Sequence, residues 1–139
     1  RIITRGHRFL VCRENRGIGD CVTLQPGQNR RWDARFNVSL RGSPSLASDQ
    51  TCEVRRLGPE GWPQVAARSE LRLHERHSGI PAAVRATLPA LWDQAGLLDV
   101  PHLNFRRDGA QMVLDVKFAP PHPLVYPPFS VVSVDTPPI

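Results

Sequence analysis

The chain has 139 residues, 40% of them hydrophobic, which is enough for one domain with its own core. No apolar stretch is long enough to span a bilayer, and the first residues lack a signal-peptide pattern. Eighteen cations against 13 carboxylates give a net charge of +5, and all the cations except Lys117 are arginine. A GC-rich genome explains that preference, and so does selection for guanidinium groups that bind phosphate at two points. Three cysteines without a CxxC pair favour reduced thiols in a cytoplasmic protein over disulfides or a structural metal.

Strand patterns dominate the first half of the chain. A hairpin is expected over residues 1–14, with Gly6 in its turn. Val22–Leu24 predicts a short strand ahead of a Pro-Gly turn. Strict alternation over Trp32–Leu40 predicts one half-buried strand, whose tryptophan lies on the apolar face. Thr51–Leu57 predicts a further strand after a loop rich in serine and proline.

Short helices and strands alternate in the second half. Trp62–Arg68 predicts one or two helical turns, and Pro81 opens a helix that stops near Leu88 because Pro89 follows it. A second short helix is expected over Pro89–Trp92. Further strands are expected over Leu97–Val100, Asn104–Arg107 and Gln111–Phe118, with Asp108-Gly109 as the hairpin turn between the last two.

These elements predict an α+β fold with a mostly antiparallel sheet and a few short helices in the second half, because turns rather than helical crossovers connect the strands. Residues 1–118 are expected to form one domain. Residues 119–139 hold half of the 14 prolines and are expected to form an extended tail.

Basic clusters are the candidate contacts with a nucleic acid. The cluster residues are Arg30 and Arg31, then Arg72, His74 and Arg76, and finally Arg106 and Arg107. Arginine forks bind phosphate, and a guanidinium beside an aromatic ring stacks on an RNA base. Each cluster has a second interpretation, as an ordinary solvated face. Trp32, next to the first cluster, fits core packing better than base stacking.

One group of residues in the second half resembles the carboxy-terminal signature of the bacterial tRNA(Ile)-lysidine synthases. The matching residues are Ile80, Pro81, Arg85, Leu88, Pro89, Trp92, Asp93, Val100, Pro101, His102 and Leu103, with Phe9–Glu14 and Trp32–Val38 as earlier matches. The family uses ATP to activate a wobble cytidine in tRNA and then joins lysine to it. It does so through an SGGxDS loop, which is absent from these 139 residues.

The resemblance therefore implies the non-catalytic carboxy-terminal part of such an enzyme. That part would bind tRNA and contact the catalytic domain of the same parent chain. It would need no cofactor itself, while the parent would use ATP and Mg. The resemblance also implies that Arg85 contacts the tRNA acceptor stem; a structural ion pair between Arg85 and Asp93 is the alternative.

No pairing of a nucleophile with a base is visible, so the chain alone is not expected to catalyse a reaction. Two other functions remain open at this point. One is a docking domain that packs on another protein surface, with its arginines merely solvated. The other is an unrelated small enzyme, which the missing catalytic pairs disfavour. A tRNA-binding domain should gather its arginines on one face, whereas a docking domain should expose an apolar patch.

Overall fold

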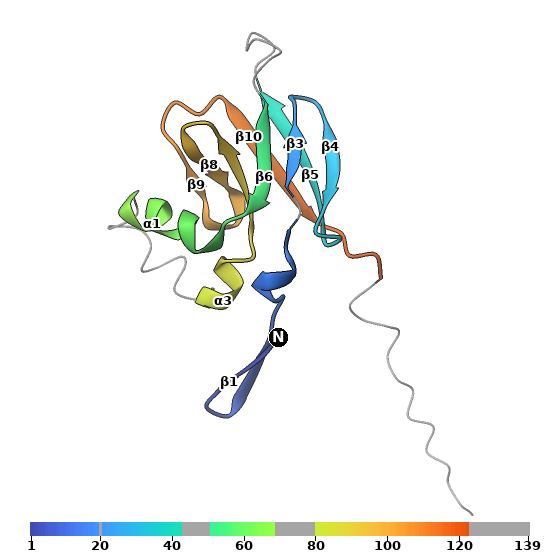
Figure 1. Cartoon of the computed structure of the whole chain (residues 1–139), viewed down its shortest axis with the longest axis vertical. Helices are drawn as coiled ribbons and strands as arrows, with labels where there is room; N and C mark the ends of the chain where they lie inside the picture. Colours follow the sequence, from blue (N-terminus) through green and yellow to red (C-terminus); the bar gives the residue numbers. More distant parts are fainter. Residues whose placement is uncertain (20, 43–50, 69–79, 123–139) are drawn as a thin grey trace, which may run out of the picture.

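The computed structural model describes residues 1–19, 21–42, 51–68 and 80–122 (Figure 1). The strands are β1 (Ile2–Arg5), β2 (Arg8–Val11), β3 (Val22–Leu24), β4 (Asn29–Trp32), β5 (Phe36–Gly42), β6 (Cys52–Arg56), β7 (Pro89–Asp93), β8 (Gly96–Val100), β9 (Phe105–Arg106) and β10 (Met112–Phe118). The helices are α1 (Gly58–Arg68) and α3 (Ala82–Arg85), with 3-10 turns η1 (Asn15–Gly17) and η2 (Pro101–Leu103). The expected α+β fold with a mostly antiparallel sheet is confirmed, since every strand pair described is antiparallel.

Three sheets organise the described residues. β1 and β2 form a hairpin of their own, β10-β5-β4 form a three-stranded sheet, and β3-β6-β7-β8-β9 form a five-stranded sheet. A first core fills the space between the two larger sheets. It contains Val38 and Leu114 from the three-stranded sheet and Val54, Leu91 and Leu98 from the five-stranded one. Both sheets therefore bury one apolar face against each other.

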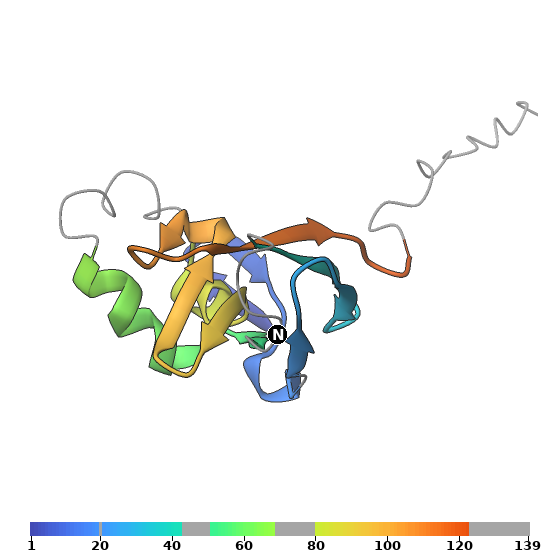
Figure 2. The ribbon, with the colours of Figure 1, turned by 90° about the horizontal axis from the view of Figure 1, so that it is seen from above.

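A second core lies on the other face of the five-stranded sheet. There Val65 of α1 packs against Trp92 and Leu97, with Leu57 and Val100. Figure 2 shows α1 and β10 on opposite sides of the β7–β8 hairpin. The five-stranded sheet is thus the middle layer of the domain, and its central strand β7 is covered on both faces.

That burial on both faces explains one wrong prediction. Pro89–Trp92 was expected to be a short helix, and its four consecutive apolar residues show no strand alternation. The segment instead forms most of β7, and its first four residues are all buried. A strand between two cores needs apolar side chains on both faces, so it loses the period of two that marks a half-exposed strand.

A second wrong prediction concerns Trp32–Leu40, which is two strands and not one. The chain reverses at Asp33 and Ala34, whose φ angles of 46° and 52° are in the left-handed region. Arg13 and Arg35 hold the carboxylate of Asp33 at 3.0 Å and 2.6 Å. Trp32 and Phe36 then become cross-strand partners on one face, which produces the same alternating pattern as a continuous strand.

The Asp108-Gly109 turn is present, but it does not make the expected hairpin. β9 pairs with β8, whereas β10 crosses to the other sheet and pairs with β5. A β-bulge in β8 supports this crossing. Leu91 pairs with Asp99 and Trp92 pairs with Leu97, so Leu98 is the extra residue. The bulge turns Asp99 toward β10, where its Oδ2 accepts a hydrogen bond from the N–H of Leu114 at 2.9 Å.

Candidate nucleic-acid interface

The side of the three-stranded sheet that faces away from the core is polar and basic. Strand pairing aligns Arg31 with Asn37 and Asn37 with Lys117, which makes one row across β4, β5 and β10. The next row is Asn29, Ser39 and Asp115, and Arg41 lies beyond it on β5. We call these seven residues the outer sheet face. Their side chains alternate with the buried residues of the first core, which explains why they all reach solvent.

The outer sheet face carries three cations and one carboxylate. Arg41 and Asp115 form a bidentate ion pair, with one contact at 2.8 Å, and hydrogen bonding to Asp115 raises the pKa of Arg41. Arg31 donates to the carbonyl oxygens of Ala34 and Ala119, both at 2.8 Å. Those two bonds hold the guanidinium against the sheet, and within the described residues its other N–H groups have no acceptor and can donate to a ligand.

Lys117 is exposed on the same face and has no ion-pair partner among the residues that the structure describes. With one carboxylate among the charged side chains, the outer sheet face has a net charge of +2. It presents no aromatic ring. Its chemistry therefore suits contacts with phosphates and sugar hydroxyls, and it does not suit base stacking.

The predicted pair Arg30 and Arg31 is divided by the sheet. Arg30 pairs with the buried Val38, so its side chain leaves β4 on the side opposite to Arg31. Its one hydrogen bond in the described structure is to the neighbouring carbonyl of Asn29 at 3.2 Å. Trp32 is fully buried in the first core, as predicted, and is not accessible to a base. Only Arg31 of this cluster contributes to the outer sheet face.

Arg85 lies on α3 and covers an aromatic ring. Its guanidinium carbon is 3.8 Å from the centre of the Trp62 ring, a cation–π contact between α3 and α1. The alternative ion pair between Arg85 and Asp93 is wrong, because Asp93 is held by Arg107. An arginine stacked on a half-buried tryptophan stabilises the packing of two helices, whether or not it also meets a ligand.

Arg106 and Arg107 diverge toward two different carboxylates. Arg106 reaches the buried Asp99 at 3.5 Å, while Arg107 forms a bidentate pair with Asp93. Hydrogen bonds from Arg107 lower the pKa of Asp93, and burial raises the pKa of Asp99. Both arginines are therefore engaged within the chain, and neither joins the outer sheet face.

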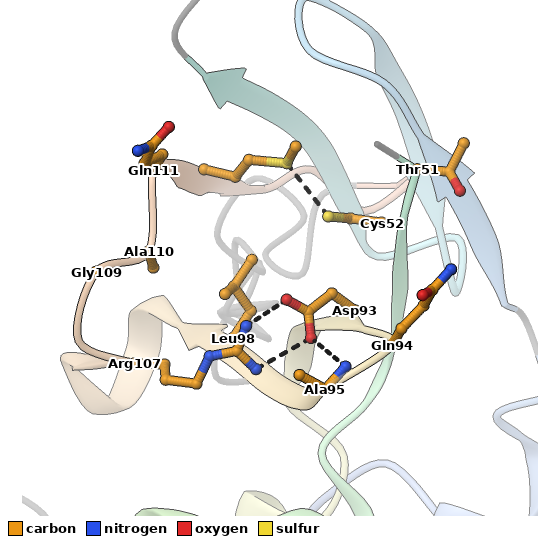
Figure 3. A pocket seen from close by; sticks show the side chains of 11 residues that line it. Thr51, Cys52, Asp93, Gln94, Ala95, Leu98, Arg107, Gly109, Ala110 and Gln111 are labelled. Carbon is orange, nitrogen blue, oxygen red and sulfur yellow. Dashed lines mark hydrogen bonds and ion pairs between the residues drawn. The ribbon is translucent and has the colours of Figure 1, made fainter. Parts of the chain in front are cut away.

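The Arg107–Asp93 pair also lines a pocket of about 460 Å³ (Figure 3). Cys52 and Met112 form its inner wall, with their sulfur atoms 3.2 Å apart. Burial raises the pKa of the Cys52 thiol, which opposes formation of a reactive thiolate. Asp93 is the one carboxylate among the residues that line this pocket, and it is held by Arg107.

Three predicted contacts, Arg72, His74 and Arg76, lie outside the described residues. Two cations that the structure places on the same sheet face as Arg31 were not predicted, namely Arg41 and Lys117. The alternation over Gln111–Phe118 could have predicted the exposure of Lys117. It places Lys117 on the face of the strand that does not carry the buried Leu114. What the sequence does not contain is the pairing of β10 with β5, which brings Lys117 level with Arg31.

No group of three residues suited to metal binding is present in the described part of the chain. Among the same residues, no helix has the length and apolar character needed to cross a membrane. Comparisons with protein-family models, with curated proteins and with solved structures gave no match.

Proposed function

We propose that this chain is the non-catalytic, carboxy-terminal tRNA-recognition region of an enzyme of the tRNA(Ile)-lysidine synthase type. The outer sheet face supports this proposal more than any other feature, because it gathers Arg31, Arg41 and Lys117 on one exposed side of a rigid sheet. A face of this kind binds the phosphate backbone of a folded RNA by charge and shape. The chemistry on the wobble cytidine, with its ATP and Mg, would belong to another domain of the parent enzyme.

The residues that resemble the family signature have a structural role consistent with this assignment. Leu88, Trp92, Val100 and Leu103 are buried in the second core, and Pro81 is the N-cap of α3. A signature made of core and cap residues marks a fold rather than an active site. It accordingly supports a family assignment for the domain and assigns no catalytic step to it.

A titration with a tRNA(Ile) transcript tests the proposal. Three phosphate contacts predict a slope of log K against log salt of about −2 to −3, at roughly 0.7 to 0.9 for each contact. The double variant Arg31→Ala/Lys117→Ala should bind roughly tenfold more weakly or worse, with a slope less negative by about 1.5 to 2. Filter binding or fluorescence anisotropy at several salt concentrations measures both quantities.

A matched control removes the same charge elsewhere. Arg16→Ala/Arg68→Ala also lowers the net charge by two, but both side chains lie away from the outer sheet face. An equal loss of affinity in the two double variants would mean that net charge alone attracts the tRNA. Absence of binding at low salt would refute the RNA-binding role itself.

The other predicted contacts are expected to act differently. Arg85, Arg106 and Arg107 already bind Trp62 and two carboxylates within the chain. Replacing any one of them by alanine should weaken tRNA binding modestly and should also reduce the stability of the domain. A loss of affinity without a loss of stability would place that arginine directly at the RNA.

A further inference from the structure

The β1–β2 hairpin exposes an apolar face that nothing in the described structure covers. Ile2, Phe9 and Val11 are 71%, 73% and 75% exposed, and they account for three of the four exposed large hydrophobic side chains in the described part of the chain. Strand pairing places Ile2 opposite Val11 and Thr4 opposite Phe9, so all four side chains share one face. Figure 1 shows this hairpin projecting from the rest of the domain.

The backbone of the same residues is also open. Arg1 and Cys12 exchange both of their N–H···O bonds, at 2.8 Å and 2.9 Å. Pairs alternate along an antiparallel ladder, so Ile2–Val11 and Thr4–Phe9 are the pairs without mutual bonds. Their N–H and C=O groups consequently point outward from both edges of the hairpin. A two-stranded sheet with two open edges and an uncovered apolar face is marginally stable until another element joins it.

The charge of the β1–β2 hairpin restricts which partner can bind to it. The first 13 residues carry Arg1, Arg5, Arg8 and Arg13 and no carboxylate. Of these, Arg13 is paired with Asp33. A second copy of the chain would bring the same cations to the contact and would be repelled. Phe9 is the single ring on this face, beside the aliphatic Ile2 and Val11, and RNA has no strand edge that could continue the ladder.

We propose that the hairpin is a docking element for an extended polypeptide strand that alternates apolar residues with carboxylates. The partner strand adds to an edge of the hairpin, and its backbone bonds with the outward-pointing groups of Ile2 and Thr4 or of Phe9 and Val11. Its apolar side chains cover the exposed face, and its carboxylates pair with the hairpin arginines. This is strand addition, with the ladder supplying affinity and the charges supplying selectivity. It uses a surface separate from the outer sheet face and does not depend on tRNA binding.

A designed peptide tests the proposal on the whole chain. The probe is a fluorescein-labelled nine-residue peptide of alternating valine and glutamate, and its control replaces glutamate by lysine. Anisotropy should show binding of the first peptide only. The variant Phe9→Thr/Val11→Thr keeps strand-forming side chains but removes two buried contacts, so the dissociation constant should rise at least about tenfold. Phe118→Thr, at an exposed phenylalanine on β10, is the matched control and should leave peptide binding unchanged.

Two proline variants examine the backbone part of the mechanism. Thr4→Pro removes an outward N–H from β1, and Val11→Pro removes one from β2, while the internal hairpin bonds remain. At least one of them should abolish peptide binding. Circular dichroism and urea midpoints should stay unchanged in the hairpin variants, because the hairpin side chains lie outside both cores.

Four results would overturn the proposal. The first is failure of the valine–glutamate peptide to bind at 1 mM or below. The second and third are peptide binding as tight as that of the wild type by Phe9→Thr/Val11→Thr, or by both proline variants. The fourth is hairpin-dependent self-association in sedimentation. Loss of tRNA affinity in Phe9→Thr/Val11→Thr, without any peptide binding, would likewise show that the hairpin serves RNA. A failed tRNA titration with intact peptide binding would leave this docking role standing and would refute only the proposed function.

Discussion

Replacing Asp99 by alanine should be among the most damaging single changes to the domain. The carboxylate is 3% exposed, accepts the N–H of Leu114 at 2.9 Å and lies 3.5 Å from Arg106. Asp99→Ala leaves a buried N–H of β10 without an acceptor, which costs about 1–3 kcal/mol. The ion pair adds about 1 kcal/mol or less, because Arg106 is 48% exposed. We expect the free energy of unfolding to fall by about 2–3 kcal/mol.

Asparagine at the same position separates the hydrogen bond from the charge. The amide oxygen of Asp99→Asn can still accept the N–H of Leu114, so at neutral pH this variant should lie within about 1 kcal/mol of the wild type. Burial raises the pKa of Asp99 in the folded state. The folded state therefore binds the proton more tightly than the unfolded state, and stability from this group falls as pH rises from about 4 through the raised value. Relative to Asp99→Asn, the wild type should be most stable in acid.

Urea unfolding followed by tryptophan fluorescence, at several pH values, measures these differences. Asp115→Ala is the control, since Asp115 also lies on the β10 side of the domain but pairs with Arg41 at the surface; it should cost less than about 1 kcal/mol. Equal destabilisation by Asp99→Asn and Asp99→Ala would show that the charge and not the acceptor oxygen matters. A loss below about 0.5 kcal/mol in Asp99→Ala would refute the role of the Leu114 bond.

Two further outcomes follow from the packing and the ion pairs. Gly61→Ala should destabilise the domain by about 1–2 kcal/mol, because the new methyl group would collide with the Leu57 side chain and lie 3.0 Å from the Trp92 ring; Gly19→Ala, with open space around it, should be neutral in the same urea experiment. Asp93→Asn should lose about 1 kcal/mol at pH 7 and nothing near pH 2, because the bond from Arg107 lowers the folded pKa of Asp93 and its stabilisation disappears as pH falls. A variant whose deficit persists at pH 2 would contradict that reasoning.

Alternation with a solvent face predicted the half-buried strands, whereas of the two strands buried on both faces Leu97–Val100 was predicted as a strand and Pro89–Trp92 was not. Thr51–Leu57 alternates because Cys52 and Val54 enter the first core while Glu53 and Arg55 stay outside, and this segment became β6. β7 has no such contrast, because both of its faces are buried. The break between β4 and β5 leaves no trace in the alternation for a different reason. A tight turn of three residues preserves the parity of the alternation on either side of Asp33–Arg35.

The candidate site was only partly predictable, because strand pairing across the chain defines it. Arg31 could be chosen from its basic neighbours. Arg31 and Lys117 share a face only because β10 pairs with β5, which is far from it in the sequence. No local sequence pattern encodes the register of that pairing. Ion pairs, in contrast, removed predicted residues from the candidate site. Arg106 and Arg107 look like a free basic cluster in sequence, yet the fold supplies each with a carboxylate.

The crossing of β10 to the other sheet has a consequence for how the chain folds during synthesis. β10 pairs with residues 70 to 82 positions earlier, whereas the β6–β7–β8–β9 ladder is complete by Arg106. A ribosome that has released the chain only as far as Arg106 would present a finished middle layer and a β4–β5 hairpin that has no third strand. Long loop closure slows such pairings, so the last step of folding should be the arrival of β10. Until then the first core is open on one side, and that interval is when the domain is most exposed to aggregation.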